Sequence, residues 1–296
     1  MQKFITTLSS LSIALLAMTT TIAVFAQGQP IGIESLPLGK DIGVATGQTV
    51  TPAYDGWYEN EDGSISVLFG YYNRNTEEIL NIPVGSGNRI IGMPDEVSDQ
   101  GQPTIFESGR HWGVFAVRLP AGSRDEVVWH LENQGKTFHI PGNLHVNYII
   151  DAISGDASDN LPPQIRFEED GPAGRGPAGI VADALQAKVG KPVTVKVWAK
   201  DDGLGGGLMS LFMGRNSKPP ALKLKWIKHR GPGDVEFSEP TARIPISGDV
   251  ATTEATFSQA GEYTLRIRVN DISGLETAGH AECCWTNGFI KVTVTN

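Results

Sequence analysis

The feature that most constrains this fold is a stretch of strict alternation near the C-terminus. From Tyr263 to Asn270 every second residue is apolar, and Thr, Arg, Arg and Asn stand between them. Successive side chains of a β-strand point to opposite faces, so this pattern predicts a strand with one face in a core and the other in water. Residues 251–257 also alternate, and a Gly-containing turn at 258–261 joins the two runs. We therefore predict an antiparallel hairpin over 251–270.

Tyr263 follows the turn of this hairpin directly. Immunoglobulin-like sandwiches carry a tyrosine corner at this place, in which the phenol hydroxyl bonds to the backbone a few residues upstream. The alternative is an ordinary half-buried aromatic side chain. We predict the tyrosine corner, and neither interpretation suggests a catalytic role.

The first 26 residues predict a signal peptide. They hold one charged residue, Lys3, followed by an apolar run from Leu11 to Phe25 and a signal-peptidase site at Val24-Phe25-Ala26. A retained membrane anchor is the weaker alternative, because the run is short and Thr19, Thr20 and Thr21 interrupt it. We expect a secreted or periplasmic protein whose mature chain begins at Gln27. Residues 27–49 form an extended arm or a loosely docked first strand.

Size and composition predict two domains. The 35 Gly and 18 Pro are spread among short alternating runs, over a chain longer than one β-sandwich needs. We predict an all-β protein of two β-sandwich domains, at 50–152 and 160–296, the C-terminal one immunoglobulin-like. The boundary lies in the polar, non-periodic segment 151–163, which ends in two prolines. The only two cysteines are adjacent, so hydrophobic packing must hold each domain together.

The first domain reads as a series of short strands separated by polar turns. Gln134-Gly135 is the clearest of these turns. The predicted strands cover residues 64–72, 79–82, 112–119, 127–131 and 137–140.

The second domain supplies further strands whose apolar faces alternate with polar residues. Trp226, in the strand that begins near Leu222, lies where immunoglobulin-like cores place their buried Trp. The predicted core residues are Val193, Val195, Val197 and Ala199, then Leu222, Leu224 and Trp226, and finally Ile290, Val292 and Val294.

Residues 160–296 also carry a resemblance. The segments VTV to DDG (193–203), AGEYTLRIRVND and the closing IKVTVT resemble PKD and related bacterial immunoglobulin-like domains. With KWIKHRGPG and CCWTNG, this half is similar to a group of uncharacterised secreted bacterial proteins, and FGYYNRN in the first domain shows a less specific likeness. The resemblance implies a β-sandwich fold and an extracytoplasmic setting, and it implies no catalytic residue.

The usual signatures of catalysis are missing from the sequence. There is no HExxH, no GxSxG and no phosphate-cradling GxxxxGKS/T. A net charge of −9 does not suit nucleic acid or an anionic membrane surface. We predict a binding or structural module of the cell envelope. The alternative is an extracytoplasmic enzyme, for example a glycan-active one, with its site in the first domain or the interdomain cleft.

Two clusters could hold a metal. His280, Cys283 and Cys284 combine an imidazole with two thiols, which suits Zn²⁺ or Cu(I), although the spacing is not a standard one. The alternatives for the cysteines are a vicinal disulfide, free thiols with a structural role, or an intermolecular bridge that would make an oligomer. Asp201-Asp202-Gly203 and Asp271 could gather Ca²⁺ at the strand ends, but turn-forming Asp is the simpler interpretation.

A basic stripe is the main candidate for partner binding. Residues 215–230 hold six Lys and Arg and no acid in an otherwise acidic chain. We predict that Lys223, Lys225, Lys228 and Arg230 bind an envelope protein or an anionic glycan. The alternative is a solvated face that discourages aggregation. A neighbouring apolar segment, 204–213, either packs against the first domain or marks a second partner-binding patch.

Overall fold

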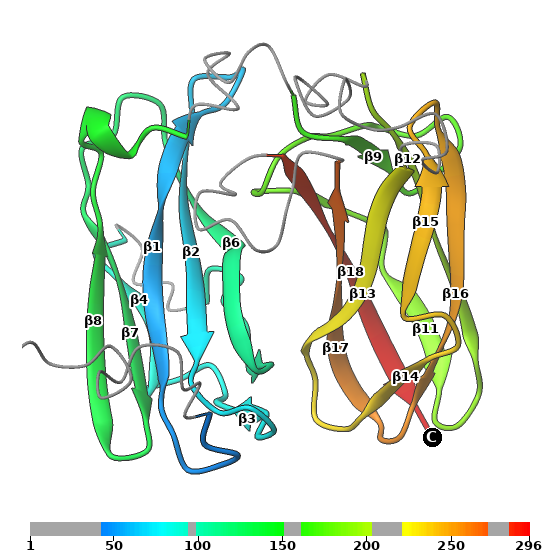
Figure 1. Cartoon of the computed structure of the whole chain (residues 1–296), viewed down its shortest axis with the longest axis horizontal. Helices are drawn as coiled ribbons and strands as arrows, with labels where there is room; N and C mark the ends of the chain where they lie inside the picture. Colours follow the sequence, from blue (N-terminus) through cyan, green and yellow to red (C-terminus); the bar gives the residue numbers. More distant parts are fainter. Residues whose placement is uncertain (1–42, 94–98, 151–160, 203–220, 272–283) are drawn as a thin grey trace, which may run out of the picture. The chain divides into compact units, whose positions relative to one another are not determined.

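The computed structural model describes residues 43–93, 99–150, 161–202, 221–271 and 284–296, and the signal peptide and residues 27–42 of the predicted arm lie outside them. The regular elements of the described residues are strands and one short 3₁₀ helix (Figure 1). In this part of the chain no helix is both long and apolar enough to cross a membrane. The all-β fold class predicted from the alternating runs is therefore confirmed.

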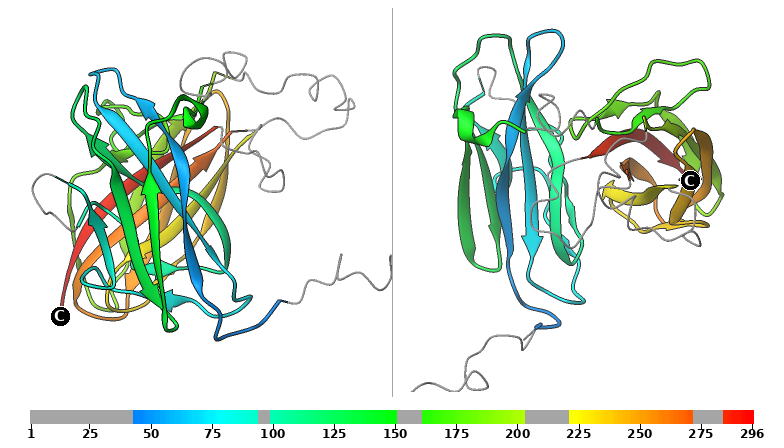
Figure 2. Two further views of the ribbon diagram at one scale, coloured as in Figure 1. Left: turned by 90° about the vertical axis from the view of Figure 1, so that its left-hand side faces the viewer. Right: turned by 45° about the horizontal axis from the view of Figure 1, so that its top comes forward.

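The N-terminal strands form a sandwich of two three-stranded sheets (Figures 1 and 2). One sheet has the order β1-β2-β6, the other has the order β4-β7-β8, and β3 and β5 form a small extra pair. The elements are β1 (Val50–Glu59), β2 (Ile65–Asn73), β3 (Leu80–Asn81), β4 (Asn88–Ile91), β5 (Ile105–Phe106), β6 (Gly109–Leu119), β7 (Val127–Asn133), β8 (Lys136–Gly142) and η2 (Val146–Tyr148).

The core of this sandwich is centred on Trp129, which is fully buried on β7. Its ring lies 6.0 Å from the ring of Phe69 on β2 and 5.0 Å from that of Phe115 on β6, in edge-on contacts. Such geometry suits the aromatic quadrupole and joins the two sheets across the core. The five predicted strands correspond to β2, β3, β6, β7 and β8, while β1, β4 and β5 were not predicted.

The β7–β8 hairpin shows why its turn could be predicted. Gln134 has a φ of 48° and Gly135 a φ of 71°, so both residues occupy the left-handed region. Two-residue hairpin loops need positive φ at both positions because only that twist matches the flanking strands. Gly135 adopts such a φ without strain, and the predicted turn is confirmed.

The C-terminal strands form a second sandwich with immunoglobulin-like topology. One sheet has the order β14-β16-β12-β9, and the other has the order β10-β18-β17-β13-β15 with β11 also on β18. The strands are β9 (Gln164–Arg166), β10 (Ile180–Val181), β11 (Leu185–Lys188), β12 (Val193–Lys200), β13 (Ala221–Arg230), β14 (Val235–Phe237), β15 (Thr241–Pro245), β16 (Asp249–Phe257), β17 (Gly261–Asn270) and β18 (Trp285–Thr295). In immunoglobulin lettering these sheets are DEBA and GFC, with β15 as an added edge strand.

The predicted core of this sandwich is confirmed. Every residue expected from the alternation belongs to one cluster, and among these expected residues all but Val193 are buried. The strands β9, β10, β11, β14 and β15 were not predicted. The first four have four residues or fewer, and β15 has five residues with exposed ends.

The predicted hairpin over 251–270 is wrong. β16 pairs with β12 and β14, whereas β17 pairs with β13 and β18, so the two strands belong to different sheets. Both strands turn their apolar faces to the same core, where the rings of Phe257 and Tyr263 lie 4.8 Å apart. A short turn between two alternating runs can join neighbouring strands of one sheet, or it can carry the chain from one sheet to the other. Here the chain crosses between the sheets, because this arrangement buries the apolar faces of both strands in the same core.

The tyrosine corner is confirmed. The Tyr263 hydroxyl donates to the Gln259 carbonyl at 2.8 Å and accepts from the Gly233 amide at 3.0 Å. One buried phenol thus holds the crossing turn and the end of the β13–β14 connection together.

The prediction that the other face of β17 meets water is also wrong. Arg266 lies on that face and is only 1% exposed, and Asn270 is buried too. The Arg266 guanidinium donates to the carbonyl of Val114 on β6, so this face packs against the N-terminal sandwich. Residues Gly43–Asn296 accordingly form one compact unit.

Candidate functional site

The four basic residues predicted to bind a partner do not share one face. Lys223 and Lys225 are exposed on the same side of β13. Lys228 falls on the opposite side by strand alternation and is partly buried, and burial lowers its pKa although the charge of Asp234 opposes this. Arg230 follows an irregularity in the pairing with β17.

Two of the four basic residues, Lys225 and Arg230, form ion pairs with the N-terminal sandwich. Lys225 Nζ lies 2.8 Å from a carboxylate oxygen of Glu107. Arg230 pairs with both carboxylate oxygens of Asp99, at 2.9 and 2.8 Å, and its Nε donates to the Gln102 carbonyl at 2.6 Å. The Arg230 hydrogen bonds hold the pKa of Asp99 below its usual value. The charges of Lys225 and Arg230 are therefore already paired with carboxylates of the same chain.

Two basic residues that the sequence did not indicate lie beside the stripe. Lys223 is directly opposite Arg243 on β15, and Lys225 is directly opposite Arg268 on β17. Arg243 is exposed, and Arg268 lies over the ring of Trp285 at 4.7 Å. Directly opposed side chains point to one face, so these like charges repel across both strand pairs. Only the register of pairing reveals this grouping, which is why sequence spacing missed it.

A buried polar network surrounds Arg266 at the contact between the sandwiches. The guanidinium donates to the Val114 carbonyl at 3.3 Å, and its Nε has no hydrogen-bond partner among the described residues. Burial lowers the pKa of Arg266, while Tyr71 and Glu107 oppose that effect. Burying a guanidinium with so few hydrogen-bond partners costs free energy. A second positive charge beside it would increase that cost, so the neighbouring titratable groups need to be neutral or negative.

Two histidines next to Arg266 remain neutral near physiological pH. Burial and the charge of Arg266 lower the pKa of His111 to about 4 and that of His229 to about 3. His229 is 3% exposed and its Nε2 lies 2.8 Å from the Gly101 carbonyl. For Glu107, burial raises the pKa, but the hydrogen bond and charge of Lys225 outweigh it and leave the pKa low. The arrangement balances charge within the interface between the two sandwiches.

The proposed metal ligands are only partly described. His280 and Cys283 lie outside the described residues, so the Zn²⁺ or Cu(I) site stays a prediction. Cys284 is fully buried and disulfide-bonded, and Cys283 is the only other cysteine of the chain. A disulfide sulfur lacks the thiolate charge that binds these metals.

The proposed Ca²⁺ site likewise gains no support. Within the described residues no group of three His, Cys, Asp or Glu side chains is placed to hold a metal ion. Asp271 is 1% exposed and lies next to the buried end of β17. Gly203 and the apolar segment 204–213 lie outside the described residues, so the predicted patch stays a prediction.

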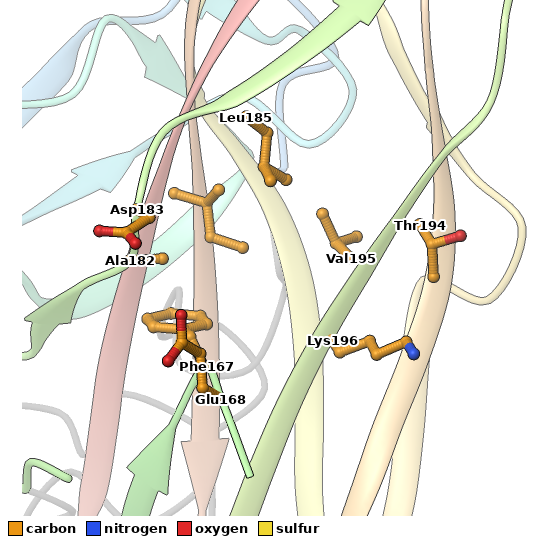
Figure 3. A pocket seen from close by; sticks show the side chains of 9 residues that line it. Phe167, Glu168, Ala182, Asp183, Leu185, Thr194, Val195 and Lys196 are labelled. Carbon is orange, nitrogen blue, oxygen red and sulfur yellow. The ribbon is translucent and has the colours of Figure 1, made fainter. Parts of the chain in front are cut away.

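A groove opens at the edge of the C-terminal sandwich, where the chain passes from β9 in one sheet to β10 and β11 in the other (Figure 3). Its volume is about 210 Å³, which is below the range of roughly 300–1,000 Å³ for small-molecule sites. The lining residues are Phe167, Glu168, Ala182, Asp183, Leu185, Thr194, Val195, Lys196 and Ile290. The groove is therefore too small to argue for a bound small molecule.

Comparison with known proteins gives no assignment. No protein-family model and no curated protein matches the chain, so the resemblance to PKD domains stays a prediction. Among solved structures, the chain is similar to the D00-D0 domain of intimin, at 11% identity over 84% of this chain and 100% of that one, with a TM-score of 0.26. Domains 4 and 5 of the S-layer protein SbsC show 12% identity over 84% and 98%, with a TM-score of 0.24. PapD-like domain 7 of human CEP192 shows 8% identity over 46% and 87%, with a TM-score of 0.28. These TM-scores are too low to indicate what the chain binds or where it acts.

Proposed function

We propose that the chain is an exported binding module that recognises an acidic partner, an anionic glycan or an envelope protein, through the outer face of β13 and β15. The observation that carries the proposal is the directly opposed pair Lys223 and Arg243, both exposed. Like charges opposite one another destabilise a sheet. An acidic partner would relieve this repulsion, and it would do so on a chain whose net charge is −9.

The three remaining members of the predicted stripe contribute less to this proposal. Lys225 is half-exposed, so it adds positive potential even while it pairs with Glu107. Arg230 is mostly covered and its two bonds to Asp99 already satisfy it. Lys228 lies on the other side of the strand.

Export is part of the proposal, because the apolar run and the Val24-Phe25-Ala26 site predict cleavage after Ala26. The intact mass of the protein recovered outside the cytoplasm should correspond to a chain that begins at Gln27. A recovered chain that retains Met1 would contradict export by this route.

The binding proposal is tested by reversing both charges, as K223E/R243E. Binding to immobilised heparin, a sulfated glycan, and to polyaspartate separates the two kinds of acidic partner. We expect at least a tenfold loss of affinity for one of them, and a binding constant for the unaltered chain that falls as salt rises from about 50 to 200 mM. The melting temperature should change by no more than a few degrees, because neither side chain belongs to the core.

A matched control is K188E/K191E, which makes the same change in charge at two exposed lysines near the end of β11. This variant should keep its affinity. Equal losses in both double variants would show that only net charge matters, and unchanged binding by K223E/R243E would mean that the pair is a solvated face.

A further inference from the structure

A separate hollow lies at the end of the N-terminal sandwich, where the chain leaves β8 and forms the short helix η2. It has a volume of about 590 Å³, within the range of small-molecule sites. Its lining residues are Asn143, His145, Asn147 and Tyr148. None of the four is an acid, a lysine or an arginine, so a charged ligand would find no opposite charge in the lining.

The loop that forms the hollow is held rigidly on β1. The Tyr54 hydroxyl donates to the Asn143 carbonyl, and Trp57 Nε1 donates to the His145 carbonyl at 2.9 Å. Farther along, the Ile150 amide donates to the Trp57 carbonyl at 2.9 Å. A loop fastened at three points loses little conformational entropy when a ligand binds.

Hydrogen bonds inside the loop also orient its side chains. Asn143 Oδ1 accepts from the His145 amide at 3.0 Å, and His145 Nδ1 accepts from the Asn147 amide at 3.2 Å. Because Nδ1 accepts, the neutral imidazole carries its proton on Nε2, which is left as a donor. In the described part of the chain the Asn147 side chain makes no hydrogen bond, so its amide offers two donors and an acceptor.

Tyr148 supplies the apolar part of the hollow. Its side chain is 49% exposed, although its ring packs 5.4 Å from that of Tyr54 and 6.5 Å from that of His145. These contacts fix the plane of the ring while they leave much of it accessible. The neighbouring Val146 is 66% exposed and extends the apolar surface.

We propose that this hollow binds a neutral sugar ring. A pyranose presents C–H groups on its faces, which pack on an aromatic ring, and hydroxyls at its edge, which match amide and imidazole groups. A purely apolar ligand would bury the polar groups of Asn143, His145 and Asn147 without partners, and that costs about 1–3 kcal/mol for each group. An anionic ligand would lose water without meeting a positive charge. This site is independent of the basic pair on β13 and β15 and goes beyond the binding proposed there.

The test uses the full mature chain and a set of neutral trisaccharides, namely maltotriose, cellotriose, xylotriose and chitotriose, titrated by calorimetry and by NMR. We expect at least one of them to bind with a Kd on the order of 1 mM, as small ligands in shallow sites do. Y148A should weaken that binding at least tenfold, and N147A should weaken it several-fold. N147A keeps the backbone amide that donates to His145, so the fold of this variant should be intact.

The matched control is Y72A, because Tyr72 is another exposed tyrosine, at 43%. It should bind the trisaccharide as the unaltered chain does, and so should K223E/R243E. Failure of all four trisaccharides to bind at about 10 mM would overturn the proposal. It would also be overturned if Y148A and N147A, shown to be folded by their melting temperatures, bound as tightly as the unaltered chain.

Discussion

Arg266 shows how one buried charge constrains its neighbours. The guanidinium sits between the two sandwiches with one hydrogen bond at 3.3 Å, near the rings of Tyr71, His111 and His229. A protonated imidazole beside it would add a second buried cation. Packing of the interface thus requires both histidines to be neutral. We therefore expect acid to destabilise this interface before the rest of the fold.

We predict that the free energy of unfolding falls as the pH drops from about 6.5 toward 4. The pKa of His229 is about 3 in the folded chain and about 6.5 when unfolded, so between these values the unfolded chain binds the extra proton. Stability from this group is complete above about pH 6.5 and declines by about 1.4 kcal/mol per pH unit below it.

The measurement is urea unfolding of the unaltered chain and of His229→Gln at several pH values. The glutamine amide can still donate to the Gly101 carbonyl but does not titrate. We expect the variant to lose less stability on acidification, with the two curves separating between about pH 6 and 4. Parallel curves would show that His229 does not contribute. The other charged groups near the interface are the same in both proteins, so their contributions cancel in the comparison.

At the scale of elements, the β16 to β17 connection decides the topology of the C-terminal sandwich. It carries the chain from one sheet to the other over a short turn, and Tyr263 is the residue that ties this turn to the rest. Its hydroxyl is the shared partner of the Gln259 carbonyl and the Gly233 amide. Without it, both backbone groups would lose a partner.

We predict that Tyr263→Phe lowers the free energy of unfolding by about 1–3 kcal/mol, since the buried ring stays and two hydrogen bonds are lost. Chemical denaturation gives the value. Tyr72→Phe, at an exposed tyrosine on β2, is the control and should change stability little. If the two variants are equally stable, the corner hydrogen bonds contribute nothing net to the fold.

At the scale of the whole molecule, the two sandwiches behave as one unit despite their separate cores. The side-chain amide of Asn287 donates to the Gly113 carbonyl at 2.7 Å. The Trp285 ring fills the space beside Gly113, where a Cβ atom on residue 113 would lie only 2.5 Å from the ring. With Lys225, His229 and Arg230 also engaged, contacts run along three strands of the C-terminal sheet. We propose that the domains 50–152 and 160–296 nevertheless fold around separate cores.

Cutting the chain between them tests this proposal. A site-specific protease sequence inserted between Asp156 and Ala157 would allow cleavage after folding. We expect the two fragments to stay together on size exclusion and to unfold in one transition, because separation would expose Trp285 and leave Arg266 and Asn287 without their partners across the interface. Fragments that separate at once would show that the interface is weak.

The sequence by itself determined the local pattern of this protein. Strict alternation predicted the principal strands, Gln134-Gly135 predicted a tight turn, and Tyr263 after a turn predicted the corner, because strand periodicity and turn φ angles are local properties. Alternation also identified the core of the C-terminal sandwich from Val195 to Val294. These inferences needed only neighbours in the chain.

Tertiary structure decided what each strand met on its other face. Alternation separates apolar from polar faces but does not say whether a polar face meets water or another sheet, so Arg266 was placed in solvent. Spacing along one strand cannot show the register with the next, so Arg243 was missed beside Lys223 and Lys228 was grouped with residues on the opposite side. The tyrosine and amides of residues 143–148 carry no periodic signal, and only folding onto β1 gathers them around one hollow.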